Sequence, residues 1–248
     1  EKAAHHYGRL TQAGHGARRP PQRGRFYVSL GGGSLRTVLP VAWRPSRQNG
    51  SGQISSGFTS GRLALKQTRI RQSPASDMDA IRHLMLAAFG ADEGPAIAHL
   101  ISALLVDHSA EPRLSLVATI DRKPVGHVLF SHARVSEADT EVPAAILAPL
   151  AVLPEFQSKG IGGQLIEAGL QGMARQGAEL VFVLGHPRYY PRYGFQPAGA
   201  LGLEAPYPIA AEHADAWMVR ALRADVLGSV HGTVSCAAAL CDPAYWLE

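Results

Sequence analysis

The feature that most constrains this chain is a glycine-rich segment at 157–163, QSKGIGG, between an apolar run and an amphipathic helix. The run is Ala144–Leu153, and helical spacing of apolar residues predicts the helix over Ile161–Arg175. N–H groups in the first turn of a helix have no partner within it, and the helix dipole adds partial positive charge there. Glycine has no Cβ atom, so an anion can approach these groups closely. We therefore expect a strand, a tight turn and a helix that together bind a pyrophosphate.

Two common nucleotide-binding patterns do not fit this segment. A dinucleotide fold requires G-x-G-x-x-G, but Leu165 stands where the third glycine would be. The P-loop pattern G-x-x-x-x-G-K-[S/T] is absent from the sequence. The pattern that does fit is [Q/R]-x-x-G-x-[G/A], with Gln157, Gly160 and Gly162 at its fixed positions.

This pattern and the lead-in at 150–156, LAVLPEF, resemble the GNAT acetyltransferase superfamily, whose corresponding loop binds the pyrophosphate of coenzyme A. The resemblance covers Thr68–Glu248 and is closest to the YhbS-like branch of N-acetyltransferases. The segment 184–195, LGHPRYYPRYGF, supports it, because a Pro-containing Tyr-Tyr sequence ending in Gly-Phe follows the fifth strand in that branch. The resemblance implies an acyl-CoA N-acyltransferase fold: a mostly antiparallel central sheet, one splayed parallel strand pair, and helices on both faces.

Apolar patterning independently predicts an α/β protein with a mixed sheet. Alternating or continuous apolar residues predict strands at Thr68–Gln72, Leu114–Ile120, Pro124–Phe130, Ala144–Leu153 and Leu180–Leu184. The tail from Trp217 to Cys236 is expected to add further strands.

Two more helices are predicted between the first and second of these strands. Ser76 or Asp77 is expected to cap the first helix, since both types of side chain accept hydrogen bonds from first-turn N–H groups. Gly94 and Pro95 are expected to open the second.

Charge divides the chain into two parts. Residues 1–66 contain eleven Lys or Arg and one acid, a net charge of +10, whereas residues 67–248 have a net charge of −6. The first part is rich in Gly, Ser and Arg and has too few apolar residues to offset its chain entropy. We predict a basic, disordered arm at 1–66 and one GNAT domain at 67–248. The arm has three open interpretations: an organelle transit peptide, a nucleic-acid-binding segment, or an extension without a selected role.

The resemblance implies which residues bind acetyl-CoA. Backbone groups of Leu150, Ala151 and Val152 are expected to pair with the pantetheine arm where the strands Ile146–Val152 and Leu180–Leu184 splay apart. The pyrophosphate is expected at Gln157, Ser158, Lys159, Gly160, Ile161, Gly162 and Gly163. His186 follows the fifth strand, and either lines the coenzyme cleft or caps the short helix after it. No metal is expected.

A tyrosine is the expected catalytic residue. Superfamily members often have a tyrosine four residues before the Gly of Gly-Phe, which is Tyr190 here, and it donates a proton to the leaving thiolate; a packing role is the alternative. Neither Cys236 nor Cys241 lies near the motif, so we expect direct attack by a neutral amine. The base that removes the amine's proton is not singled out, and the candidates are His127, His132, Glu93, Glu137, Asp139 and Glu141.

The predicted function is transfer of an acetyl group from acetyl-CoA to a primary amine of a small molecule or protein. A non-catalytic acyl-CoA-binding module is the alternative. The spacing of Cys236 and Cys241 fits no zinc framework and is typical of structural thiols in a reducing compartment, with a disulfide between them as the alternative. No apolar stretch of about 18 residues exists, so we expect a soluble cytoplasmic protein. Its partners are expected to be acetyl-CoA and the amine acceptor, with a homodimer as a possible assembly and without membrane or nucleic acid.

Overall fold

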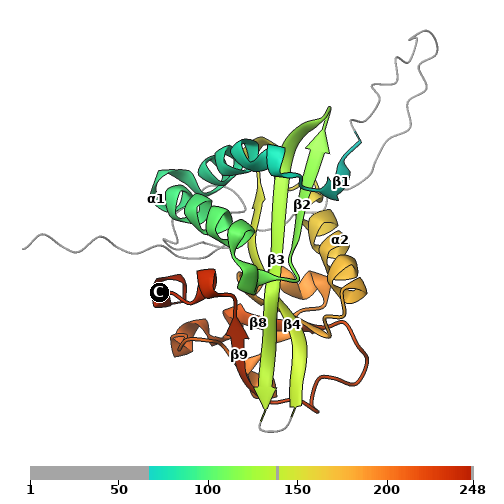
Figure 1. Cartoon of the computed structure of the whole chain (residues 1–248), viewed down its shortest axis with the longest axis vertical. Coiled ribbons are helices and arrows are strands. Elements are labelled where there is room, and N and C mark those ends of the chain that lie inside the picture. Colours follow the sequence, from blue (N-terminus) through green and yellow to red (C-terminus); the bar gives the residue numbers. More distant parts are fainter. Residues whose placement is uncertain (1–66, 138–139, 247–248) are drawn as a thin grey trace, which may run out of the picture.

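The protein is described by a computed structural model over residues 67–137 and 140–246 (Figure 1). The predicted arm at 1–66 and the candidate base Asp139 lie outside these residues. The helices are α1 (Met78–Val106) and α2 (Ile161–Arg175). The strands are β1 (Arg69–Gln72), β2 (Leu114–Ile120), β3 (Lys123–Glu137), β4 (Thr140–Val152), β5 (Leu180–Leu184), β6 (Gln196–Pro197), β7 (Leu203–Glu204), β8 (Trp217–Ala221) and β9 (Gly232–Cys236).

In this part of the chain nine strands form one mixed sheet. Its main order is β1-β2-β3-β4-β5-β8-β6, and β9 pairs with β3 and β7. Most neighbours are antiparallel, while β4 pairs with β5 and β7 with β9 in parallel. The predicted class, a mostly antiparallel mixed sheet with one parallel pair near its centre, is confirmed, and the short β7–β9 pair adds a second.

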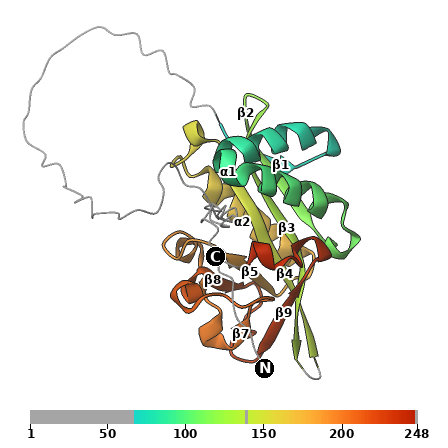
Figure 2. The ribbon, with the colours of Figure 1, turned by 90° about the vertical axis from the view of Figure 1, so that its left-hand side faces the viewer.

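The predicted bounds of β2, β5 and α2 match the structure, but the hairpin of β3 and β4 is longer than expected. The sequence prediction ended the third strand at Phe130, whereas β3 continues to Glu137. Its second half gains a new neighbour, because Ala133–Ser136 pairs with Thr233–Cys236 of β9 (Figure 2). A strand from the far end of the sequence therefore stabilises a segment that local patterning leaves undefined.

The prediction that Gly94 and Pro95 open a second helix was wrong. α1 breaks at Gly90, whose φ of 74° and ψ of −170° interrupt the helix, and Pro95 lies inside the part that continues. A Cβ atom on Gly94 would lie 2.9 Å from the Cα atom of Leu86. Gly94 therefore allows the two halves of α1 to pack closely, which explains a glycine that does not begin a helix.

Asp77 precedes α1, as expected of a capping residue, but its carboxylate does not cap the helix. It accepts hydrogen bonds from the guanidinium of Arg71 at 2.6 and 3.2 Å. The carboxylate thus joins β1 to the start of α1.

The two helices cover opposite faces of the sheet (Figure 1). On one face, Leu100, Ile101 and Leu104 of α1 belong to the same buried cluster as Leu129 of β3. On the other face, α2 packs into a cluster that includes Phe130, the next residue of β3. This alternation follows from the period of two in a strand. Neither helix of the described residues has the length and apolar character needed to cross a membrane.

The contact between α2 and β3 leaves no space for a side chain at Gly169. A Cβ atom there would collide with the ring of Phe130, which is completely buried and has nowhere to move. Gly169 therefore sets how closely α2 can approach the sheet.

We expect Gly169→Ala to lower the free energy of unfolding by about 1–2 kcal/mol. Overpacking a core costs roughly 1–3 kcal/mol, and the upper part of that range, about 2–3 kcal/mol, applies here because the buried ring of Phe130 cannot move away. Alanine returns about 1 kcal/mol through helix propensity. Urea denaturation measures the change. Gly199→Ala is the matched control, because a Cβ atom at Gly199 meets nothing within 4 Å. Equal stability of Gly169→Ala and the parent chain would contradict this account.

Candidate functional site

The parallel pairing of β4 with β5 ends early. The ladder joins Ala144–Ile146 to Leu180–Phe182, although β4 continues to Val152 and β5 to Leu184. The two strands therefore part beyond this ladder, as the sequence analysis expected. Peptide groups of β4 that point toward β5 beyond Ile146 lie outside the ladder, so this edge can accept a strand-like ligand.

A bulge in β4 lies where the strands part. Val128 of β3 pairs with Leu150 and Phe130 pairs with Leu147, so Leu129 faces the two residues between them, Ala148 and Pro149. Bulges redirect a strand and increase its local twist. The bulge therefore accompanies the separation of β4 from β5.

The residues expected to meet the pantetheine arm follow this bulge. Leu150, Ala151 and Val152 pair with β3 on their other side, and their side chains are buried. Their contact with the pantetheine arm through backbone groups stays a prediction.

The glycine-rich loop folds back on the end of β4. The side-chain nitrogen of Gln157, expected to bind pyrophosphate, donates to the carbonyl oxygen of Val152 at 2.9 Å. Ser158 and Gly160 both have left-handed backbones, with φ of 59° and 78°. These two residues turn the chain sharply, so α2 begins close to the end of the strand.

The first turn of α2 presents the expected N–H groups. The N–H group of Gln164 makes the first bond within the helix, to the carbonyl oxygen of Gly160 at 3.1 Å. The N–H groups of Ile161, Gly162 and Gly163 come before it and are the orphan donors of a helix start. Gly160 is exposed, and a Cβ atom there would meet nothing within 4 Å. The loop is therefore open to an anion at Gly160.

The Cβ positions of Gly162 and Gly163 face two tyrosines of the chain. Both are buried, and a Cβ atom on Gly162 would collide with the hydroxyl group of Tyr189. A Cβ atom on Gly163 would lie 2.6 Å from the hydroxyl oxygen of Tyr193. These glycines make room for two tyrosines of the chain, and the binding of a pyrophosphate by their N–H groups stays a prediction.

The tyrosine-rich segment packs against the residue that follows β5. Tyr190 begins the short 3-10 helix η4 (Tyr190–Tyr193) and is 1% exposed. Its ring packs edge-on against Tyr189 and Phe195, with centroids 5.2 and 5.6 Å apart, and against Gly185 just after β5. Burial raises the pKa of Tyr190 well above its ordinary value, so the phenol stays protonated at neutral pH.

Two other predicted ligand-binding residues make local contacts. The Nδ1 atom of His186 accepts a hydrogen bond from the N–H group of Arg188 at 3.1 Å, as a residue that caps the turn before η4 would. The ammonium group of Lys159 donates to the carbonyl oxygen of Glu155 at 2.7 Å and lies 5.1 Å from the ring centroid of Phe156. Both side chains therefore brace the loops that carry them.

Among the candidate bases whose side chains the structure describes, His127 is the one that the fold buries completely. Its Nε2 atom lies 2.9 Å from the hydroxyl oxygen of Ser115, and its Nδ1 atom has no hydrogen-bond partner in the described part of the chain. Burial lowers the pKa of His127 to about 3, so its imidazole is neutral at physiological pH. The candidate Glu141 pairs with Arg134 at 2.9 Å instead.

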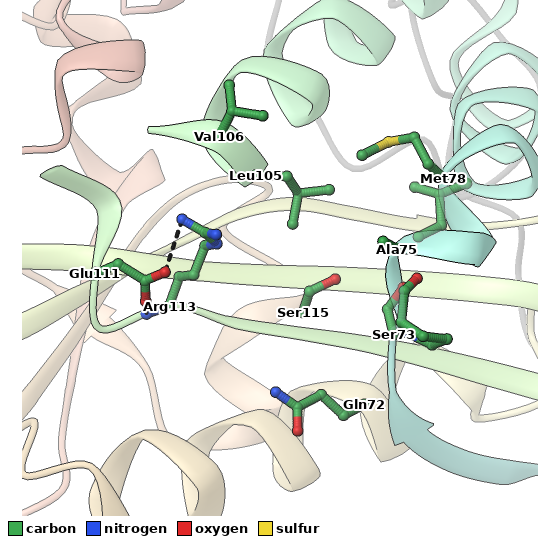
Figure 3. A pocket seen from close by; sticks show the side chains of 11 residues that line it. Gln72, Ser73, Ala75, Met78, Leu105, Val106, Glu111, Arg113 and Ser115 are labelled. Carbon is green, nitrogen blue, oxygen red and sulfur yellow. Dashed lines mark hydrogen bonds and ion pairs between the residues drawn. The ribbon is translucent and has the colours of Figure 1, made fainter. Parts of the chain in front are cut away.

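A pocket of about 410 Å³ lies between α1 and the edge formed by β1 and β2 (Figure 3). Its lining includes the apolar side chains of Met78 and Leu105 and the polar side chains of Gln72 and Arg113. Ser115, the partner of His127, also lines it. The lining comes from separate segments, so no local motif could have identified it. Within the residues described, no group of three or more His, Cys, Asp or Glu is arranged to hold a metal.

Comparisons with known proteins agree with this geometry. The sequence model of the acetyltransferase (GNAT) domain matches residues 69–198. The uncharacterized N-acetyltransferase YjhQ of Escherichia coli K12 is 45% identical over 163 residues, which cover 65% of this chain and 88% of YjhQ. The matched residues 69–198 run from β1 to just beyond η4 and therefore contain the loop and both splayed strands.

Two solved structures share the fold. That of YhbS from Escherichia coli, in complex with CoA, has a TM-score of 0.62 at 30% identity and covers 70% of this chain and 91% of its own. A GNAT family acetyltransferase from Brucella melitensis, in complex with acetyl-CoA, has a TM-score of 0.54 at 28% identity and covers 71% and 99%.

We expect Gly162→Ala to lower the free energy of unfolding by about 1–3 kcal/mol, because the added methyl group collides with the hydroxyl group of Tyr189. The same substitution should cost far less in a Tyr189→Phe background, where the next atom, Cζ, lies at an ordinary 3.6 Å. Urea denaturation of the two single variants and the double variant measures this coupling. An equal cost in both backgrounds would show that the hydroxyl group does not require the glycine.

The buried imidazole of His127 should make stability depend on pH. In the unfolded chain this group takes up a proton near pH 6.5, whereas in the folded chain it stays neutral until about pH 3. Protonation therefore favours unfolding, and the contribution present above pH 6.5 is lost as the pH falls toward 3. Relative to His127→Gln, the parent should lose up to about 1.4 kcal/mol more per pH unit in that range. Parallel curves of stability against pH would contradict the assignment.

Proposed function

Because the chain belongs to the GNAT acetyltransferase family, we propose that it transfers the acetyl group of acetyl-CoA to a primary amine of a small molecule or protein. The observation that carries the proposal is the early end of the β4–β5 ladder, with the start of α2 just beyond it. The relatives named as N-acetyltransferases, and the solved structures that contain CoA or acetyl-CoA, support the same activity.

The residues present suit a coenzyme A thioester. The backbone of Leu150, Ala151 and Val152 offers amide groups at the open edge of β4, where the amides of a pantetheine arm can pair as a strand would. The loop Gln157–Gly163 offers the first-turn N–H groups of α2 to the pyrophosphate. In this assignment Gln157 and Lys159 act by holding the loop in place. Gln157 donates a hydrogen bond to the carbonyl oxygen of Val152 at the end of β4, and Lys159 donates one to the carbonyl oxygen of Glu155 just before the loop.

Acetyl-CoA supplies an activated acetyl group as a thioester, and the acceptor amine attacks it directly. A backbone N–H group on the open edge of β4 stabilises the negative charge that develops on the carbonyl oxygen. In this proposal Tyr190 provides the proton that the leaving thiolate takes up, and its buried phenol is neutral at physiological pH. Cys236 and Cys241 take no part, because both lie on the C-terminal segment that follows β8.

The charge of residues 67–248 favours a cationic acceptor. Residues 67–248 have a net charge of −6, which attracts protonated amines toward the protein. A protonated amine must lose a proton before it can attack, so the acceptor site requires a base or a water that leads to one.

The proposal is tested with the full chain, acetyl-CoA and a panel of amines and peptide N-termini. Release of free thiol that depends on an added amine, together with the acetylated amine in the mass spectrum, would support it. Calorimetric binding of acetyl-CoA without thiol release for any amine would identify an acyl-CoA-binding module instead. If well-folded protein gives no heat with acetyl-CoA, both functions are excluded.

Tyr190→Phe should lower kcat by about 100-fold or more, the usual contribution of a general acid. The Kd for acetyl-CoA should change less than about twofold, because the phenol oxygen is required only when the thiolate leaves. Tyr207→Phe is the matched control, since Tyr207 lies beside Trp246 in the C-terminal segment, with ring centroids 6.2 Å apart. An unchanged kcat for Tyr190→Phe would leave this tyrosine with a packing role alone.

A further inference from the structure

The two cysteines of the chain lie side by side. Cys236 is the last residue of β9, and Cys241 follows the short 3-10 helix η7 (Ala238–Leu240). Their Sγ atoms are 3.7 Å apart, and both thiols are free. The sequence contains no other cysteine, so each thiol has the other as its one possible partner within the chain. The close approach of the two thiols is a property of the fold.

We propose that Cys236 and Cys241 are a redox modification site, at which a small disulfide compound converts the two thiols into a reversible intramolecular disulfide. The sulfurs need to move closer by less than about 2 Å to reach bonding distance. η7 brings them together, because the N–H group of Cys241 donates to the carbonyl oxygen of Ala238 at 3.0 Å.

The two thiols have different environments, which sets the order of reaction. Cys241 is exposed, and its thiol donates to the carbonyl oxygen of Ala237 at 3.5 Å. Cys236 is partly buried in the strand opposite Ala133 of β3. Burial raises the pKa of Cys236 to about 12, with the neighbouring thiol of Cys241 adding to the effect. Few Cys236 thiolates exist at neutral pH, so the external disulfide reacts first at Cys241.

The reaction is two thiol–disulfide exchanges with a glutathione-type disulfide. The Cys241 thiolate attacks one sulfur of the disulfide, which forms a mixed disulfide and releases one thiol. Cys236 then loses its proton to solvent and attacks the Sγ atom of Cys241, which releases the second thiol. The protein loses two electrons and two protons, and one small disulfide becomes two small thiols.

The crosslink would fasten the C-terminal segment at a junction of three elements. The N–H groups of Ala238 and Ala239 donate to Ser109 and Asp107, just after the end of α1, both at 2.8 Å. The indole N–H of Trp246 donates to Leu240 of the same 3-10 helix at 2.8 Å, and Trp246 fills the core under α1. Figure 1 shows this segment, in red, beside the end of α1. Joining η7 to β9 would therefore hold Trp246 and α1 against the sheet.

The full chain is incubated with oxidised glutathione, and its intact mass and thiol content are measured after denaturation. We expect the parent to lose two hydrogen atoms and both thiols, and to form no disulfide-linked dimers. Cys236→Ser should stop at the mixed disulfide and gain one glutathione on Cys241, whereas Cys241→Ser should stay largely unmodified. The parent alone decides the question if a variant fails to fold. Retention of both thiols, or disulfide-linked dimers in place of the internal bond, would overturn the proposal.

A second measurement follows the consequence for the fold. The oxidised parent should melt a few degrees above the reduced parent, because a bond between Cys236 and Cys241 restricts the unfolded chain. The oxidant should leave the melting temperature of Cys241→Ser unchanged. A parent that oxidises fully without a rise in melting temperature would show that the bond does not fasten the C-terminal segment.

Discussion

The early end of the β4–β5 ladder is the constraint on which the candidate site depends. Pairing stops at Ile146 and Phe182 while both strands continue, so the sheet has an open edge at its centre. Interior strands rarely leave backbone groups unpaired, because an unpaired buried amide is costly. A sheet that opens in this way is suited to a ligand that supplies the missing partners. The start of α2 lies close to the end of β4, so the open edge of the strand and the first-turn N–H groups of the helix follow one another along the chain.

The glycines at the start of α2 and within it serve three physical purposes. Gly160 adopts a left-handed backbone that ends the loop and begins α2. Gly162 and Gly163 admit the hydroxyl groups of Tyr189 and Tyr193 against the first turn of the helix. Gly169, two turns later, admits the ring of Phe130. Together these contacts hold α2 close to the sheet and to the tyrosine-rich segment, so the position of the N–H groups depends on packing far from the loop.

Burial shifts the pKa values of the buried tyrosine and imidazole groups in opposite directions, because it favours the neutral form of each. It raises the pKa of Tyr190 and lowers that of His127, so both side chains are neutral at physiological pH. The same cause acts on Cys236, whose thiol resists ionisation while exposed Cys241 meets the solvent. Desolvation thus assigns different reactivities to groups that the sequence presents as similar candidates.

The sequence alone determined the elements that depend on local patterning. β2, β5 and α2, and the loop before α2, follow from apolar periodicity and from glycine at fixed spacing, which act within a few residues of the chain. Only the tertiary structure decided the kink at Gly90, the length of β3, the tyrosine contacts of Gly162 and the closeness of Cys236 to Cys241. Each of these depends on a partner that is distant in sequence or on the three-dimensional course of the backbone, such as β9 beside β3. A pattern read along the chain reports periodicity and turn chemistry, whereas the space available to a side chain is set by whatever folds against it.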